Sequence, residues 1–235
     1  MEIMDFFKKD YKLYTINGKT TDRPVPEQGI RRFFYLLTSH FSKLVTANLL
    51  FLLFCLPVVS IPAAIAGMAR VTGNLVRDGN TFVWTDFIAE FKQSSVKSMK
   101  FGLLWFVPIG LLALAYFKNG GIYFTSYFPF VLLIFGFGLL FILSCYGFYM
   151  IAFIDLPLRA IIRNTVVFLF SETKRNTVMF LVSALIFALC LIGFPYSVPF
   201  MLLIVFAPLI LFISTVVDPA VQKRVIEPFG GRQEI

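Results

Sequence analysis

The chain has 235 residues, of which 58% are hydrophobic and only 14% are charged, and its formal net charge is +8. Soluble domains carry about 25% charged residues, and 30 phenylalanines are too many to bury in a water-soluble domain of this length. The composition therefore predicts an all-α polytopic membrane protein. It excludes intrinsic disorder, collagen-like structure and a disulfide-stapled secreted scaffold.

The basic residues lie in short segments between apolar runs, where the positive-inside rule places Lys and Arg on the cytoplasmic side of a membrane. No segment is long enough to form the folded basic module that nucleic-acid binding requires. We therefore expect the lipid bilayer, with its anionic headgroups, to be the partner of these charges, and we expect no nucleic-acid partner.

Residues 1–32 are predicted to form a cytoplasmic amphipathic segment followed by a linker. Apolar side chains recur there at helical spacing with lysines between them, at Ile3, Phe7, Tyr11 and Tyr14. This pattern is typical of a helix that lies on an anionic membrane surface. Two prolines, Pro24 and Pro26, indicate an extended linker before the first apolar stretch.

The transmembrane domain is predicted over 33–217, and its first apolar stretch contains two prolines. Pro57 and Pro62 cannot continue the helix that precedes them, so we expect a turn between two spans, at about 33–56 and 61–77. If the stretch were one span, the chain would have five spans, and the two most basic segments would lie on opposite sides. Six spans place 20 of the 21 Lys and Arg residues, and both termini, in the cytoplasm.

The second predicted span is rich in small residues at helical spacing, such as Ala63 with Gly67. Small residues allow helices to approach closely inside a bundle, so this helix is expected to be central, with a re-entrant helix as the alternative. It also contains Arg70, a charge that needs a partner or a route to the surface. Asp86 and Glu90 are the candidate partners.

An amphipathic pattern precedes the third predicted span, 101–118. Apolar residues repeat at i, i+3, i+4 and i+7, opposite acidic ones, which predicts a cytoplasmic surface helix over 84–91. Four of its side chains form a candidate partner-docking surface: Trp84, Asp86, Phe87 and Phe91. The alternative interpretation is that Arg70 only pins this helix to the bundle.

The remaining spans are predicted at about 127–154, 177–194 and 199–217. The last two come from one uncharged run, which is too long for a single span of about 20 residues and is interrupted by Pro195 and Pro199. Another cytoplasmic surface helix is expected over 156–170, and 218–235 are predicted to form a cytoplasmic tail.

No catalytic, cofactor-binding or metal-binding residues are predicted. The three cysteines lie in apolar runs and the chain has a single histidine, His40, so no zinc ligand set can be assembled. The predicted spans contain no Asp or Glu, and the sequence has no HExxH, GxSxG or Walker motif. Asn48 is expected to form hydrogen bonds between helices, with ligand binding as the alternative.

Residues 48–63 resemble the opening signature of the YesL-like family, a group of uncharacterised bacterial integral membrane proteins. Residues 84–87, followed by Phe91 and Lys92, resemble the family's second recurrent block, and the resemblance covers most of 33–217. Ser60-Ile61-Pro62 departs from the more usual Thr-x-Gly. The resemblance implies a bacterial plasma-membrane protein, often encoded beside carbohydrate-uptake or polysaccharide-degradation systems, with no established catalytic residue.

We therefore expect a non-enzymatic protein that acts as an accessory or modulatory component of a bacterial membrane complex. A transporter permease is the candidate partner, and the link to carbohydrate uptake comes only from the resemblance. The alternative is a small-solute transporter or channel, which could act as a homo-oligomer. A transporter should have a cavity lined by polar side chains, whereas a solid Leu and Phe core argues against one.

Overall fold

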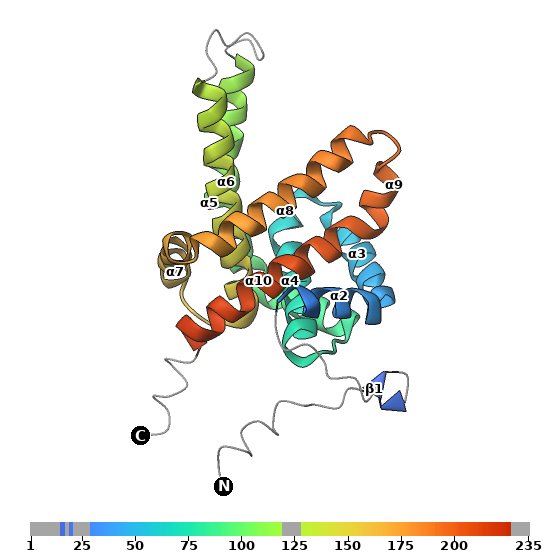
Figure 1. Ribbon diagram of the computed structural model, residues 1–235. Coiled ribbons are helices and arrows are strands. Elements are labelled where there is room, and N and C mark those ends of the chain that lie inside the picture. The colour runs from blue at the N-terminus through green and yellow to red at the C-terminus, as the bar shows by residue number, and fades with distance from the viewer. Residues whose placement is uncertain (1–14, 17–18, 21–28, 119–127, 227–235) are drawn as a thin grey trace, which may run out of the picture.

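The computed structural model describes residues 15–16, 19–20, 29–118 and 128–226 (Figure 1). A short antiparallel hairpin, β1 (Thr15–Ile16) and β2 (Lys19–Thr20), comes first. The helices that follow are α2 (Ile30–Ser39), α3 (Phe41–Cys55), α4 (Ile61–Asp78), α5 (Val83–Lys118), α6 (Phe128–Phe153), α7 (Leu158–Ser171), α8 (Thr173–Ile192), α9 (Val198–Phe200) and α10 (Phe206–Val221). Three short segments of tighter or wider helix are η1 (Val58–Ser60), η2 (Met201–Val205) and η3 (Gln222–Ile226). The amphipathic helix predicted over Ile3–Tyr14 and the end of the tail lie outside the described residues.

Several long apolar helices indicate a membrane protein. Among the described residues, four helical stretches are long and apolar enough to cross a membrane: Val58–Asp78, Phe135–Phe153, Thr173–Ile192 and Val198–Val225. A fifth is present if α2 and α3 cross together as one bent span. The structure thus supports four to five spans by length and composition, compared with the six that the sequence predicts.

The predicted first span is not one straight helix. It breaks at His40, and the axes of α2 and α3 differ by 85°. The sequence contains no glycine or proline at this point, so the bend follows from packing. α2 turns to lie against α4 and α10, which buries Leu36 completely and lets Arg32 donate a hydrogen bond to the Val76 carbonyl near the end of α4.

The predicted turn between Pro57 and Pro62 is confirmed. α3 ends at Cys55, Pro57 precedes η1, and Pro62 lies in the first turn of α4, where a proline leaves no helical hydrogen bond unmade. The Ser60 hydroxyl donates to the carbonyl oxygens of Phe54 and Pro57, each at 2.6 Å. These bonds hold the chain reversal together.

α4 lies at the centre of the bundle, as its small residues predict. It packs against α3, α5, α6 and α10, and Ala63 and Ala66 are completely buried. Gly67 lies against Phe87, and a Cβ atom at Gly73 would overlap the ring of Phe153. Helices α5 and α6 therefore approach α4 at the positions where it has no side chain.

The predicted surface helix and third span form one continuous helix, α5. Residues 92–100, expected to separate them, contain no glycine or proline, and two of their serines, Ser94 and Ser98, are buried. Nothing local therefore ends the helix before it runs on beside α6, as Figure 1 shows. The helix predicted over 156–170 is α7.

Candidate functional site

A buried carboxylate joins α4, α6 and α10 near the end of α4. The side chain of Asp218 is only 8% exposed and accepts hydrogen bonds from Arg77 Nε at 2.7 Å and from Tyr149 Oη at 2.7 Å. Gln222 Nε2 donates to the other carboxylate oxygen at 2.9 Å. We call Arg77, Tyr149, Asp218 and Gln222 the Asp218 cluster.

Two arginines of α4 contact the ring of Phe153 on α6, next to this cluster. The guanidinium of Arg77 lies 4.0 Å from the ring centroid and that of Arg70 lies 4.8 Å from it. Gly73 lies between the two arginines on the same face of α4 and leaves room for the ring. An arginine over an aromatic face is stabilised by about 0.5–2 kcal/mol, more when water is excluded.

Arg70 makes its hydrogen bond to a backbone group. It donates to the Ala152 carbonyl at 2.7 Å and forms no ion pair within 4 Å of Asp86 or Glu90 in the described part of the chain. Its charge still attracts both acids and works to lower their pKa values. The structure therefore places Arg70 beside its predicted partners without direct contact.

The Asp218 cluster ties α4, α6 and α10 together through one buried carboxylate. The carboxylate of Asp218 accepts hydrogen bonds on both oxygens from groups of its own chain, and its charge is balanced by Arg77. Arg77 Nη2 is buried and has no hydrogen-bond acceptor among the described residues. An ion pair that ties three helices together resists separation, because losing one member leaves the other charge buried and unpaired.

Sequence reasoning missed this cluster because it ended the last span at Val217 and assigned Asp218 to the tail. One signal was available: Arg77 and Asp218 have opposite charges, and each lies near the cytoplasmic end of a predicted span. Two such helices could bury their last charges against each other.

A second polar group fixes the connection between α4 and α5, which we call the α4–α5 corner (residues 79–86). Gly79 ends α4 with φ of 68°, a left-handed conformation that glycine adopts without steric cost. The carboxylate of Asp86 then accepts hydrogen bonds from Thr81 Oγ1 at 2.7 Å and from the Phe82 amide and Asn74 Nδ2, each at 3.0 Å.

Lys43 of α3 extends this network. Its ammonium group donates to the Thr81 carbonyl at 3.1 Å and to the side chain of Asn80. The α4–α5 corner is therefore held by side chains from α3, α4 and α5.

The two acids of this region have pKa values shifted in opposite directions. Partial burial works to raise the pKa of Asp86, but the hydrogen bonds from Thr81, Asn74 and the Phe82 amide, with the attraction of Arg70, outweigh it and lower the pKa. Glu90 is 7% exposed. Burial raises its pKa, although Ser94, Arg70 and Lys97 oppose the shift.

The structure does not bring the predicted docking residues onto one surface. Trp84 is 58% exposed, whereas Phe87 is completely buried. Its ring is parallel to that of Phe91, with centroids 6.4 Å apart, and both rings pack against Phe54 of α3. Phe82, which sequence reasoning did not single out, is 73% exposed near Trp84 in sequence. Phe82 lies before the first residue of the amphipathic repeat, so the repeat did not predict its exposure.

Asn48 links α3 to the start of α10 and is completely buried. Its amide nitrogen donates to the Leu202 carbonyl at 2.6 Å, and its amide oxygen accepts from the Ala207 amide at 2.9 Å. These backbone groups are five residues apart, the separation that a π-helical bond joins; Leu202 lies in η2 and Ala207 in the first turn of α10. The polar side chain of Asn48 is therefore buried and bonded to two backbone groups.

A partly open pocket of about 280 Å³ lies between α4, α6 and α10, and Phe51 of α3 and Phe187 of α8 also line it. Most of its lining is Phe, Leu and Ile, and its polar members bond within the protein. Ser144 donates to the Leu140 carbonyl at 2.8 Å, Ser214 is 2.8 Å from the Thr72 hydroxyl, and Tyr149 bonds Asp218. The pocket therefore offers little to a polar solute.

The described residues contain no group of three or more His, Cys, Asp or Glu side chains that could hold a metal ion. Cys55, Cys145 and Cys190 are free thiols, and each is half-buried.

Comparison with known proteins gives one match. A family model described as "Protein of unknown function, DUF624" matches residues 44–116, which is under a third of the chain. The matched region runs from α3 through α4 into α5 and contains both blocks on which the sequence resemblance rests. No curated protein and no solved structure matches the chain.

Proposed function

We propose that this protein is a non-enzymatic, accessory or modulatory component of a bacterial membrane complex. The α4–α5 corner supports the proposal: Phe82 before α5 and Trp84 in its first turn are exposed, and the corner is fixed by hydrogen bonds from three helices. Exposed aromatic side chains on a rigid support lose little entropy when they bind, which is why such residues dominate protein interfaces.

The proposed topology has six spans in the plasma membrane with both termini in the cytoplasm. It rests on the distribution of the basic residues and puts the α4–α5 corner on the cytoplasmic side. Reporter domains fused after Asn80 and after Gly120 test it. They are expected on opposite sides of the membrane, and reporters on the same side would exclude six spans.

The proposed partner is a transporter permease, and carbohydrate uptake, which the YesL-like resemblance suggests, is the first process to test. A photo-crosslinking amino acid at position 84 is the probe, and the same amino acid at position 96 is the control, because Val96 is exposed on α5 away from the corner. We expect a discrete adduct with one membrane protein from position 84 only. Adducts with lipid alone, or the same adducts from both positions, would overturn the proposal.

The alternative is a transporter or channel for a small, weakly polar solute, and the partly open pocket between α4, α6 and α10 is the observation that would favour it. The hydroxyls of Ser144, Ser214 and Tyr149 in that pocket already bond other groups of the protein, which argues against recognition of a polar solute. Uptake by proteoliposomes that contain only this protein separates the two functions. We expect none, and saturable uptake would establish the alternative.

A further inference from the structure

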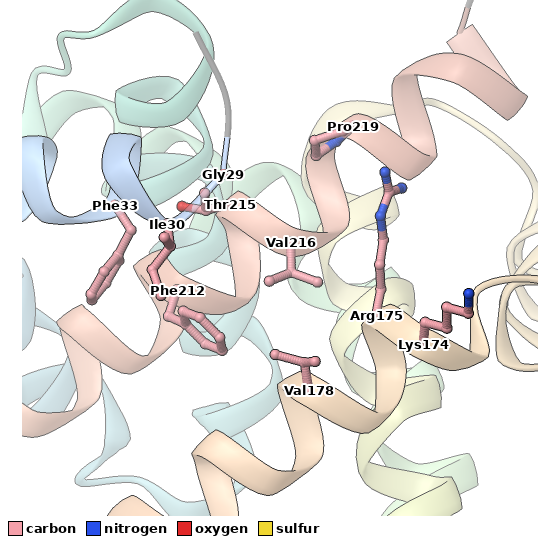
Figure 2. Close-up of a pocket in the computed structure, with 10 residues that line it drawn as sticks. All are labelled: Gly29, Ile30, Phe33, Lys174, Arg175, Val178, Phe212, Thr215, Val216 and Pro219. Atoms are coloured by element: carbon pink, nitrogen blue, oxygen red, sulfur yellow. The ribbon is translucent and has the colours of Figure 1, made fainter. Parts of the chain in front are cut away.

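Two adjoining cavities lie between α8 on one side and α2 and α10 on the other. Their volumes are about 480 Å³ and about 750 Å³, and Ile30, Phe33 and Phe212 line both of them. We call this continuous space the α8 groove. Figure 2 shows its smaller cavity, with Val178 and Phe212 facing the space between α8 and α10.

One end of the α8 groove is basic. Lys174 and Arg175 lie there, at the start of α8 (Figure 2). Glu172 is the neighbouring acid; it is 3.3 Å from Arg175 and 2.9 Å from Arg224. One carboxylate therefore faces two arginines, and Lys174 forms no ion pair with a described residue. The end of the groove keeps a net positive charge.

The rest of the groove is apolar apart from two threonines, Thr38 and Thr215. The Thr215 hydroxyl donates to the Leu211 carbonyl at 2.8 Å. Lys174, Val178, Val182 and Ile186 follow one another at intervals of four residues, so they share one face of α8. Twelve residues of helix rise about 18 Å, slightly more than half of the roughly 30 Å hydrocarbon core of a bilayer. Thr38 in the larger cavity already donates its hydroxyl to the Phe34 carbonyl at 2.9 Å, so this hydroxyl needs no further partner.

We propose that the α8 groove binds an anionic glycerophospholipid, with one acyl chain in the groove and the phosphate at Lys174 and Arg175. The basic end and the apolar face, about one leaflet long, match the two chemical parts of such a lipid. The inference rests on the proposed topology, which places the start of α8 at the cytoplasmic leaflet, where anionic lipids concentrate. It does not depend on the accessory function.

The test measures the lipid retained by the full chain. The protein is delipidated in mild detergent, offered equal amounts of phosphatidylglycerol and phosphatidylcholine, and examined by native mass spectrometry. We expect a preference of about five- to thirty-fold for phosphatidylglycerol, as two basic residues near a headgroup can provide. The variant Lys174→Ser/Arg175→Ser should lose this preference, whereas Lys92→Ser, an exposed lysine of α5, should keep it.

The acyl-chain position needs a second pair of variants. Val182→Trp fills the groove and should abolish retention of both lipids, whereas Leu185→Trp, on an exposed position of the same helix, should retain them. Equal retention of the two lipids by the native chain, or unchanged retention by the Val182→Trp variant, would overturn the proposal. So would a lipid-free dimer that buries the groove. Melting temperatures of all variants show whether each is folded.

Discussion

Helices α4 and α8 are both long enough to cross a membrane, but their environments differ. In its most apolar window, 67% of α4 is buried inside the protein, compared with 17% of α8, although α8 is the more apolar helix. Hydropathy therefore does not identify the centre of this bundle. Small residues do, because they let neighbouring helices approach α4, whereas the large side chains of α8 cover surface that faces lipid or another protein.

The largest expected effect on stability comes from the Asp218 cluster, which holds α4 to α6 and α10. Asp218→Ala leaves Arg77 buried without its carboxylate, which should lower the free energy of unfolding by about 3–5 kcal/mol. Thermal unfolding in detergent measures the change. The double variant Arg77→Met/Asp218→Leu should recover most of the loss, since no charge then remains unpaired. A loss below about 1 kcal/mol in the single variant would show that the Asp218 cluster does not hold the helices together.

The next largest effect tests the close approach of α6 to α4 at Gly73. Gly73→Val places methyl groups where the Phe153 ring lies and should destabilise the protein by about 1–3 kcal/mol. Gly136→Ala on α6 is the control, because a Cβ there meets no atom within 4 Å. That substitution should be neutral or stabilise the helix by up to about 1 kcal/mol. Similar melting temperatures for the two variants would contradict the close approach of the Phe153 ring to Gly73.

A smaller effect is expected where α3 meets α10. Asn48→Leu removes both hydrogen bonds to the backbone, to Leu202 of η2 and Ala207 of α10, and should cost about 1–2 kcal/mol, which chemical or thermal unfolding can resolve. Thr46→Leu is the matched control, because the Thr46 hydroxyl bonds only within its own helix, to the Ser42 carbonyl at 3.0 Å. Equal losses would mean that Asn48 does not link the helices.

The acids of α5 should respond to pH with opposite signs. The lowered pKa of Asp86 means that its charged form stabilises the fold above the unfolded pKa, near 3.8, and that this contribution is lost as pH falls. The raised pKa of Glu90 means that its protonated form stabilises the fold below the unfolded pKa, near 4.5, and that this contribution is lost as pH rises. Melting temperatures are measured between pH 4 and pH 8 and compared with those of the native chain. Near neutrality, Asp86→Asn should melt at a lower temperature than the native chain and Glu90→Gln at a higher one. Both differences should shrink in acid, and shifts of the same sign would contradict the assignment.

The smallest effect should be on α8. Leu185→Ala truncates an exposed side chain and should change stability by no more than about 0.5 kcal/mol. A loss above about 2 kcal/mol, the range of a buried leucine, would show that this face of α8 packs inside the protein.

Much of the architecture was predictable where local chemistry decides it. Pro57 and Pro62 predict the first chain reversal, and Ala63 with Gly67 predicts the central position of α4. The bend at His40 was not predictable, because no residue there favours it and packing of α2 on α4 and α10 produces it. The continuity of α5 does not follow from the sequence, because the charged residues of 92–100 indicate a boundary, although no glycine or proline there ends the helix.

The candidate sites also include some that the sequence predicts and some that depend on packing between helices. Asn48 was predictable as a polar residue inside a span. The Asp218 cluster was not, because a charge at the end of an apolar run looks exposed until the partner on another helix is known. The amphipathic spacing predicts Phe87 on a docking surface. Spacing cannot tell a face that meets a neighbouring helix from one that meets solvent, and Phe87 meets α4 and Phe54.

The contrast between α4 and α8 can be measured directly with a lipid-soluble diazirine probe. The purified protein is labelled in lipid vesicles and the modified residues are located by mass spectrometry. We expect strong labelling of Leu181, Leu185 and Leu189, which are exposed on α8, and almost none between Ala63 and Val76 of α4. Labelling of α4 as strong as that of α8 would contradict the buried position of α4. Labelling that α8 shows in vesicles but loses in native membranes would identify α8 as the face that a partner covers.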